Sequence, residues 1–230
     1  MKGEVTMFKG AITAIVTPFK NGKVDEQKLR DLVKFQIKNG INGIVPVGTT
    51  GESPTLDHDE HREVIEICID ATAGRVPIIA GTGSNSTAEA IALTKHAAKA
   101  GADGALIVSP YYNKPTQEGL YRHYKAIADS VDIPIIVYNI AGRTAVNIET
   151  STLARIARDC KNVVGVKEAS GSLTQMQSVK QECPEDFILL CGDDALTLPV
   201  LSIGGVGVIS VAANLIPNDV VTLVNTFNTG

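Results

Sequence analysis

Short hydrophobic runs rich in valine and isoleucine recur along the whole chain. Runs of about four to eight apolar residues without alternation are typical of parallel strands that are covered on both faces of a sheet. We therefore predict eight strands, over residues 11–19, 43–48, 76–83, 104–110, 133–139, 163–169, 187–194 and 205–214.

Segments with helical periodicity separate these runs. Residues 25–40 carry leucine, valine and isoleucine on one helical stripe, with Asp25 placed as the N-cap and Gly40 as the stop. Ser86 and Gly101 delimit a second helix in the same way. Further helices are expected within residues 55–71, 116–130, 149–160 and 172–183.

Eight strands that alternate with helices are typical of either a closed (β/α)8 TIM barrel or a doubly wound open sheet. An open sheet usually carries a glycine-rich phosphate turn after its first strand, whereas "TPFKNGKVD" follows the first strand here. The sequence "GTGSNS" at 81–86 resembles part of such a turn but lacks the third glycine. We therefore predict an α/β fold of the (β/α)8 barrel type, with residues 1–230 as one domain.

The end of the chain leaves little room for the last helix of a barrel. The eighth apolar run ends at Asn214, and only residues 215–230 follow it. A barrel typically has about 250 residues. The sequence thus predicts that the chain stops after the eighth strand and the start of the eighth helix, and that a C-terminal helical extension is missing.

Composition narrows the class of partner. The chain is 44% hydrophobic and 20% charged, and its net charge of −4 is spread without long runs of like charge. This balance argues against nucleic acid or a membrane surface and favours a small molecule. No segment approaches the roughly 18 apolar residues of a membrane span, and the N-terminus lacks the apolar run of a signal peptide. We therefore expect a cytoplasmic protein.

The four cysteines do not form a recognisable site. Cys68, Cys160, Cys183 and Cys191 are scattered, with no CxxC pair and no histidine at metal-ligand spacing. This pattern predicts neither a zinc site nor a disulfide framework. We interpret them as small buried residues in a reducing compartment.

In a barrel the active site lies at the carboxyl ends of the strands. The polar residues at these ends include threonines, tyrosines and one lysine, but no histidine and no cysteine. A Ser/His or Cys/His nucleophile is therefore disfavoured. Glu52, Asp193 and Asp194 could bind a cation, but their spacing matches no known ligand motif, and hydrogen bonding to loop amides explains them at least as well.

Lys167 lies within "VVGVKEAS" (163–170), a run that otherwise reads as a buried strand. An ammonium group that points into an apolar barrel loses solvation, so its pKa should fall from about 10.4 toward neutrality. The neutral amine is a nucleophile that can form a Schiff base with a ketone or aldehyde. The alternative is a lysine that pairs with Glu168 or leans out at the strand end.

Six motifs, in chain order, together resemble the dihydrodipicolinate synthase family of pyruvate-dependent class I aldolases. Each lies on or directly after a different predicted strand, and the resemblance extends along the whole chain. The motifs are "VGTTGES" (47–53), "SPYYNKPTQEGL" (109–120), "YNIAGRT" (138–144), "GVKEASG" (165–171), "CGDD" (191–194) and "GVISV" (207–211).

The resemblance implies a lyase that joins pyruvate to L-aspartate 4-semialdehyde and gives 4-hydroxy-tetrahydrodipicolinate, on the diaminopimelate route to lysine. It implies that Lys167 forms the Schiff base with pyruvate, without metal or organic cofactor. Tyr138 matches the proton donor and acceptor, and Thr49 and Tyr112 match its relay. Hydroxyl groups suit such a relay because they pass protons without carrying a buried charge.

Other positions match substrate-binding and assembly residues of the family. Thr50, Gly192 and the backbone near Ile209 match positions at the pyruvate site. Arg143 matches the arginine that holds the carboxylate of the semialdehyde, a role that suits its planar guanidinium. Tyr112 matches a tyrosine that reaches into the site of a neighbouring subunit, which implies a homotetramer made of tight dimers.

Feedback inhibition by L-lysine is a further family trait. The matching positions are Ser53, Pro54, His58, His61, Asn85, Glu89 and Tyr111. Pro54 departs from the alanine of some regulated members, and the two histidines could equally be solvated helix residues. A second departure is Ala141, which stands where the family commonly has a proline that would stiffen the loop of Arg143.

Three other functions remain open at this point. The first is the same Schiff-base chemistry with a sugar-derived aldehyde, as in N-acetylneuraminate lyases and keto-deoxy-sugar-acid aldolases. The second, from another class, is a non-catalytic barrel that binds an oxo acid. The third and weakest is a metal-dependent barrel hydrolase. "GTTGE" together with Arg143 favours the dipicolinate reaction.

Overall fold

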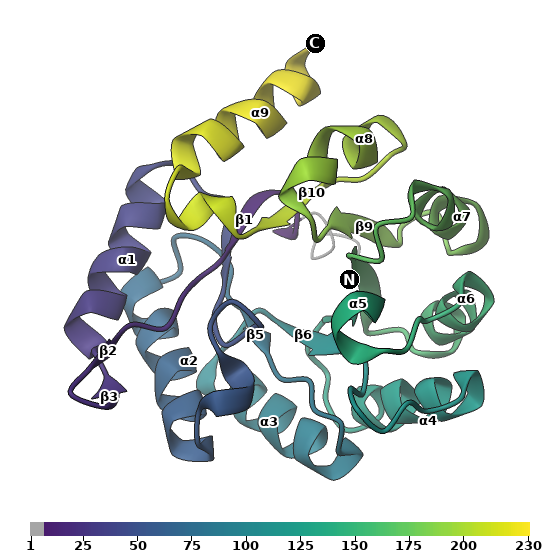
Figure 1. The fold of residues 1–230 in the computed structure, drawn as a ribbon, viewed down its shortest axis with the longest axis horizontal. Helices are drawn as coiled ribbons and strands as arrows, with labels where there is room; N and C mark the ends of the chain where they lie inside the picture. The colour runs from purple at the N-terminus through teal and green to yellow at the C-terminus, as the bar shows by residue number, and fades with distance from the viewer. Residues whose placement is uncertain (1–6) are drawn as a thin grey trace.

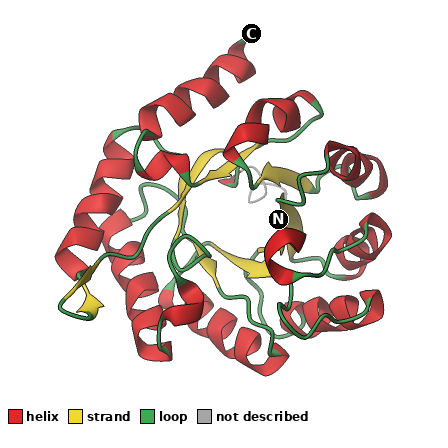
Figure 2. Ribbon diagram, in the orientation of Figure 1, coloured by secondary structure: helices red, strands yellow, loops and turns green. Residues whose placement is uncertain are grey.

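The chain folds into a β/α barrel in the computed structural model, which describes residues 7–230. Figure 1 looks into the barrel, with the strands in the middle and the helices around them, and Figure 2 shows the same division into an inner ring of strands and an outer ring of helices. The barrel strands are β1 (Gly10–Ala14), β4 (Gly43–Val45), β5 (Ile79–Gly81), β6 (Gly104–Val108), β7 (Ile135–Asn139), β8 (Val163–Glu168), β9 (Ile188–Cys191) and β10 (Gly207–Ser210).

Parallel pairing closes these strands into a ring. The hydrogen-bonded order is β4-β1-β10-β9-β8-β7-β6-β5. The two end strands meet through a bridge between Ile44 and Ile78 and through the hydrogen bond from Gly81 N to Pro46 O, at 3.0 Å. The predicted barrel and its eight strands are therefore confirmed, although each strand is shorter than its apolar run.

The helices cover the outer face of the ring. Asp25, Ser86 and Gly101 cap helices as predicted, and the chain turns at positive φ at Gly40. The long helices are α1 (Glu26–Lys38), α2 (His58–Thr72), α3 (Thr87–Ala100), α4 (Gln117–Ala128), α6 (Thr150–Asp159), α7 (Leu173–Glu182) and α9 (Pro217–Thr229).

Several short elements were not predicted. A hairpin, β2 (Phe19–Lys20) with β3 (Lys23–Val24), follows the first barrel strand. The helices α5 (Ala141–Thr144) and α8 (Thr197–Ser202) are too short for a periodic signal, as are the 3-10 turns. Those turns are η2 (Ser53–Thr55), η3 (Asp194–Leu196) and η4 (Ala212–Asn214). In Figure 1, α5 lies nearer the barrel axis than the outer helices do.

The segment after the eighth strand is helical over most of its length. It forms α9, which has 13 residues. Pro217 is the first residue of α9, where a backbone N–H would have no partner within the helix, so proline is favoured at this position. Val224 is fully buried on its inner side. Residues 217–229 therefore form the helix for which the sequence leaves room after the eighth strand.

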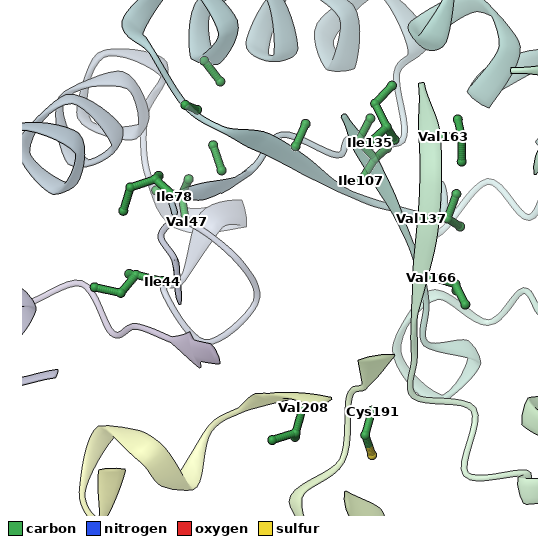
Figure 3. Packing of buried hydrophobic residues seen from close by; sticks show 14 of the residues in the cluster. Ile44, Val47, Ile78, Ile107, Ile135, Val137, Val163, Val166, Cys191 and Val208 are labelled. Carbon is green, nitrogen blue, oxygen red and sulfur yellow. The ribbon is translucent and has the colours of Figure 1, made fainter. Parts of the chain in front are cut away.

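Two layers of core result from the alternation of side chains along the strands. Inside the barrel, Ile12, Ile136 and Leu190 belong to a small cluster that Phe8 also joins. Between strands and helices lies a larger cluster of outward-pointing residues, part of which Figure 3 shows: Ile44, Val47, Ile78, Ile107, Ile135, Val137, Val163, Val166, Cys191 and Val208.

The cysteines lie mostly in these cores. All four are free thiols, and all except the half-buried Cys183 are buried. Burial raises the pKa of the Cys68 and Cys191 thiols to about 12 and about 11. The interpretation of the cysteines as small core residues is confirmed for the three buried ones.

No helix in residues 7–230 is long and apolar enough to cross a membrane.

Two histidines are buried among the outer helices. His123 of α4 is 5% exposed, its Nδ1 lies 2.9 Å from Thr87 Oγ1, and its Nε2 has no partner in the described part of the chain. Burial lowers the pKa of His123 and of His61 in α2 to about 4 each. Both rings are therefore neutral in the folded protein above that pH.

We predict that these histidines make the fold sensitive to mild acid. The unfolded chain takes up a proton at a pKa of about 6.5, and the folded rings do so only near 4. The free energy of unfolding is therefore highest above about pH 6.5 and falls as the pH drops toward 4. At pH 5 the loss is roughly 2 kcal/mol for each histidine. Urea unfolding of the wild type and of His123→Gln at pH 7.5 and pH 5 measures this. The variant should lose roughly 2 kcal/mol less than the wild type, and an equal loss in both would contradict the assignment.

Candidate active site

A one-residue shift of register aims Lys167 into the barrel. Strand β8 pairs with β7 as Ile135↔Val163 and then as Ile136↔Gly165, so Val164 is an extra residue on β8. After this shift Lys167 lies beside Tyr138, whose side chain belongs to the inner cluster. Without it, Lys167 would have aligned with the outward-pointing Asn139, because side chains alternate along a strand.

A glycine allows this arrangement. A Cβ atom at Gly165 would lie 2.1 Å from Ile188 Cγ1 and 2.7 Å from Ile188 O of the next strand. No side chain can be accommodated at these distances, so strands β8 and β9 approach each other here only because the residue is glycine.

Lys167 is desolvated and stands over an aromatic ring. Its side chain is 5% exposed, and Nζ lies 4.2 Å from the centre of the Tyr138 ring. Burial lowers the pKa of Lys167 to about 8, and the negative charge of Asp194 partly opposes this change. About a tenth of the amine is therefore neutral, and so nucleophilic, at pH 7, against well under a thousandth for a lysine of ordinary pKa.

Glu168 does not neutralise Lys167. Its carboxylate points the other way, toward the helices, and accepts hydrogen bonds from Asn139 Nδ2, Gln175 Nε2 and Ser170 N. Within residues 7–230 no carboxylate oxygen lies within 4.0 Å of the Lys167 amine. The alternative of an ion pair between these two neighbours is therefore wrong.

A cavity of about 280 Å³ opens at the carboxyl ends of the strands, on the side of Tyr138. Thr49, Tyr138 and Arg143, which the sequence singled out, all line it, and most of its surface is apolar. The remaining wall comes from the ends of strands β5 and β6 and from the segments after β4, β5, β6 and β7: Val47, Gly48, Ser53, Pro54, Gly81, Gly83, Leu106, Val108, Tyr111, Ile140 and Thr144.

The phenol of Tyr138 is held in its neutral form. Burial raises the pKa of Tyr138, and Thr49 and the positive charge of Arg143 act in the opposite direction. The Thr49 influence is a side-chain hydrogen bond, so the hydroxyls of Thr49 and Tyr138 lie close together. Tyr112, which is 88% exposed, is not among the groups that shift the pKa of Tyr138.

Tyr112 lies outside the cavity. It is 88% exposed and has a φ of 74°, a left-handed conformation that non-glycine residues adopt rarely. Its neighbour Tyr111 points to the cavity instead. The backbone therefore presents the Tyr112 side chain to the surroundings of the chain.

The other positions expected near pyruvate do not line the cavity wall within residues 7–230. Gly192 lies against Lys167, because a Cβ atom there would be 3.0 Å from Lys167 Cε. Ile209 is fully buried in the inner cluster, on the strand next to Gly192. Thr50 follows Thr49 and is half-buried.

The expected lysine-binding residues gather around the N-terminal ends of α2 and α3. His58 Nε2 lies 2.6 Å from Glu89 Oε1, and Ser84 also donates to Glu89. These hydrogen bonds, that of Ser84 first, lower the pKa of the Glu89 carboxyl. Ser53, Pro54 and Tyr111 line the cavity, Asn85 O accepts from Asn113, and His61 is buried.

Two of the three acidic residues considered as cation ligands, Asp193 and Asp194, accept hydrogen bonds from backbone amides. Asp193 accepts from Ala195 N, and Asp194 accepts from Val211 N and Ala212 N, each at 3.0 Å. No cluster of three histidine, cysteine, aspartate or glutamate side chains suited to a metal occurs in the described residues. Hydrogen bonding to loop amides, the alternative stated above, explains both aspartates.

Sequence reasoning missed how Asp194 and Asn139 contribute. Asp194 was interpreted as a cation ligand or as an acceptor for loop amides, and the effect of its charge on Lys167 was not foreseen. Asn139 follows Tyr138 and organises contacts behind the site. Its place directly after a strand tyrosine was the only available signal, and the partners of both residues come from distant segments.

Comparison with known proteins gives a consistent result along the chain. A model of the dihydrodipicolinate synthetase family matches residues 7–230. The chain is 65% identical to 4-hydroxy-tetrahydrodipicolinate synthase of Syntrophus aciditrophicus (strain SB), over 97% of this chain and 77% of that protein. It is 60% identical to the same enzyme of Endomicrobium trichonymphae, with the same coverage.

Solved structures match equally well. Dihydrodipicolinate synthase from Aquifex aeolicus is 49% identical, with a TM-score of 0.96 over 97% of this chain and 76% of that one. The enzyme from Cyanidioschyzon merolae, solved with lysine bound, is 46% identical, with a TM-score of 0.93 over 96% and 76%. A monomeric dihydrodipicolinate synthase variant is 47% identical, with a TM-score of 0.95 over 98% and 76%.

We predict that Lys167 titrates with a midpoint near pH 8, as its burial implies. Trace acetylation between pH 6 and pH 11, followed by peptide mapping, measures the midpoint for each lysine separately. Asp194→Asn should move the Lys167 midpoint lower still, because it removes the negative charge that favours the ammonium form. A Lys167 midpoint near the ordinary lysine value of about 10.4 would refute the prediction.

Proposed function

The chain belongs to the dihydrodipicolinate synthetase family, and we propose that it condenses pyruvate with L-aspartate 4-semialdehyde to 4-hydroxy-tetrahydrodipicolinate, a step toward diaminopimelate and lysine. Its close relatives carry the name of this activity. The observation that carries the proposal is the buried amine of Lys167, which has a pKa of about 8 and faces Tyr138.

The proposed chemistry begins with Lys167. Its neutral amine adds to the ketone carbon of pyruvate, and loss of water gives an imine. Removal of a methyl proton then gives an enamine, whose carbon attacks the aldehyde of the semialdehyde. The amino group of the semialdehyde displaces Lys167 from the imine carbon, which closes the ring and restores the free amine.

Tyr138 is the proposed proton carrier for these steps. Burial keeps its phenol protonated, so it can donate to the oxygen that leaves as water and to the alkoxide formed from the aldehyde. Thr49 lines the cavity beside it. We propose that Tyr112 completes the relay from a neighbouring subunit, which its 88% exposure permits.

Arg143 is the proposed anchor of the semialdehyde carboxylate. It lines the cavity and makes no ion pair in the described chain, so its guanidinium can form a bidentate contact with a ligand. Its positive charge also reaches Tyr138, whose pKa it lowers. The proposed site of carbon–carbon bond formation therefore lies between Lys167 and Arg143.

We propose that pyruvate binds directly beside the Lys167 side chain. Gly192 leaves space against the Lys167 side chain, and Thr50 and the backbone near Ile209 are the proposed contacts of the pyruvate carboxylate. The imine itself acts as the electron sink in this scheme. The proposed reaction therefore requires no metal and no organic cofactor.

The proposed assembly is a homotetramer of tight dimers. Tyr112 supports this because a large aromatic side chain in a left-handed backbone conformation is presented away from its own site. A monomeric variant exists among the similar structures. The dimer is the part of the assembly on which the proposed Tyr112 relay depends.

A sugar-derived aldehyde is the second candidate substrate. It would use the same lysine and tyrosine, and no feature of the cavity favours it. The pairing of Thr49 and Thr50 with Arg143 supports a short aldehyde that carries a carboxylate.

The first test of the function is capture of the Schiff base. Incubation with pyruvate and borohydride should add a 1-carboxyethyl group to Lys167, because reduction traps the imine on its neutral amine. Peptide mapping by mass spectrometry locates the group. Lys167→Ala should show no adduct and no activity, whereas Lys95→Ala, a change of an exposed lysine, should match the wild type.

The same proteins then separate the candidate substrates. Turnover with aspartate semialdehyde but not with N-acetylmannosamine or keto-sugar aldehydes supports the proposal. An adduct without turnover of any aldehyde would leave the non-catalytic oxo-acid binder as the better function, and absence of the adduct would exclude the Schiff-base mechanism.

The second test concerns feedback by L-lysine. We propose that the ammonium group of lysine binds the Glu89 carboxylate beside His58, with Ser53, His61, Asn85 and Tyr111 around it. Activity should fall with increasing L-lysine. Glu89→Gln should weaken inhibition about tenfold, since it removes a charge-assisted contact. Glu66→Gln, which removes an exposed charge on α2, should not, and flat activity of the wild type across the titration would remove the proposal.

A further inference from the structure

A polar cluster with a buried centre and a half-buried edge lies directly behind Lys167 and Tyr138, between the strands and the helices. It consists of Asn139, Asn147, Glu168 and Gln175. Asn139 and Glu168 are adjacent in register on β7 and β8, each directly after Tyr138 or Lys167. Both are buried, with exposures of 1% and 0%. We call this set the Glu168 cluster.

Glu168 is the centre of the cluster. Its oxygens accept from Asn139 Nδ2 at 3.1 and 3.2 Å, from Gln175 Nε2 at 3.1 Å and from Ser170 N at 2.8 Å. No cationic group within residues 7–230 pairs with it. A buried carboxylate is costly, so its retention among neutral donors points to a specific role in orientation.

The carboxylate fixes which way the surrounding amides face. The side-chain nitrogens of Asn139 and Gln175 both point to Glu168. The Asn139 oxygen therefore faces Ile148 and accepts from its backbone N–H, at 3.1 Å. Gln175 Nε2 likewise reaches Ile148 O at 3.3 Å, and its oxygen accepts from Asn147 Nδ2 at 2.8 Å. Glu168 thereby holds the segment at 147–148.

That segment ends the loop on which Arg143 stands. Gln117 of α4 holds it from the other side, by donating to Asn147 O at 2.9 Å and accepting from Glu149 N at 3.1 Å. Inside the loop, Thr144 Oγ1 donates to Val146 O at 2.9 Å. These contacts fix the backbone on the C-terminal side of Arg143.

Arg143 depends on this support because its side chain is exposed and has no hydrogen-bonding partner in the described chain. The single turn of α5 that carries it begins at Ala141, with no side-chain cap. The position of the guanidinium therefore follows from the backbone, and the backbone at 147–148 is held by the Glu168 cluster.

We propose that Glu168, through Asn139, Asn147 and Gln175, is a positioning residue for the Arg143 loop and so sets the affinity for the carboxylate-bearing aldehyde, separately from Schiff-base formation at Lys167. This inference rests on the proposed function, in which Arg143 binds that aldehyde. It predicts a selective defect, because Lys167 is oriented by strand register and the Arg143 loop by the cluster.

Glu168→Gln is the sharpest variant. It keeps the size and shape of the side chain but turns one acceptor into an NH2 donor that faces the amide donors of Asn139 and Gln175. At least one amide must then rotate and release Ile148. Asn147→Ala removes the loop end of the cluster directly. Glu182→Gln on the exposed end of α7 is the matched control for loss of one charge.

We expect Glu168→Gln and Asn147→Ala to raise the KM for aspartate semialdehyde about tenfold, the loss of about one well-formed hydrogen bond to a charged group. The KM for pyruvate and the yield of the reduced pyruvate adduct on Lys167 should change less than about twofold. Glu182→Gln should match the wild type in all three. In an Arg143→Ala background, Glu168→Gln should have little further effect on the aldehyde KM.

Hydrogen exchange gives a readout that does not depend on activity. Peptides covering residues 140–148 should exchange faster in both cluster variants, and peptides covering β8 should not. If Glu168→Gln does not fold, Asn147→Ala decides the question by the same measurements. If the wild type forms no pyruvate adduct, the proposed function fails, and the exchange data still test the cluster.

Three results would overturn the inference. The first is unchanged exchange at 140–148 in a folded cluster variant. The second is a parallel loss of pyruvate adduct and aldehyde turnover, which would mark a general structural role. The third is an equal effect of Glu168→Gln with and without Arg143, which would show that the two do not act on the same interaction.

Discussion

The site depends on one shift of register between β7 and β8. The extra residue Val164 turns Lys167 to the inner face of the barrel and Glu168 to the outer face. A shift of one position exchanges the two faces of a strand completely. Had the strands paired without it, a carboxylate would have entered the barrel and the amine would have met the helices, so the reactive group follows from backbone geometry before any side-chain chemistry.

The same shift separates two electrostatic tasks that would otherwise interfere. The role proposed for Lys167, attack on a carbonyl, requires an amine without its proton, and a carboxylate in contact with that amine would favour the ammonium form. The Glu168 carboxylate instead accepts hydrogen bonds from Asn139, Gln175 and Ser170. The pKa of Lys167 is therefore set mainly by desolvation, which lowers it, and by the more distant charge of Asp194, which raises it.

Periodic features could be predicted from the sequence, and contacts between distant segments could not. The eight strands and the caps at Asp25 and Ser86 depend on neighbouring residues, so they were predicted. The position of the bulge at Val164 could not be predicted, because the valines at 163, 164 and 166 are apolar on either face and only Gly165 hints at an irregular strand. Lys167 was singled out as a lysine within an apolar run, and Tyr138 and Arg143 through the family motifs. The contacts of the Glu168 cluster could not be predicted in this way, because they come from β7, α7 and the end of the Arg143 loop.

The setting of Lys167 reflects a compromise between its two charge states. In the proposed mechanism, a fully apolar pocket would favour the neutral amine that attacks pyruvate, but it would penalise the protonated imine that forms next. The face of the Tyr138 ring, 4.2 Å from Nζ, and the charge of Asp194 both stabilise a cation at this position. A pKa of about 8 lies between that of a solvated lysine and that of a lysine buried without any such groups, so both states remain accessible near neutral pH. In the proposed mechanism the valines around Lys167 favour the neutral amine that attacks. Asp194 and the Tyr138 ring keep this apolar setting from destabilising the cationic imine that follows.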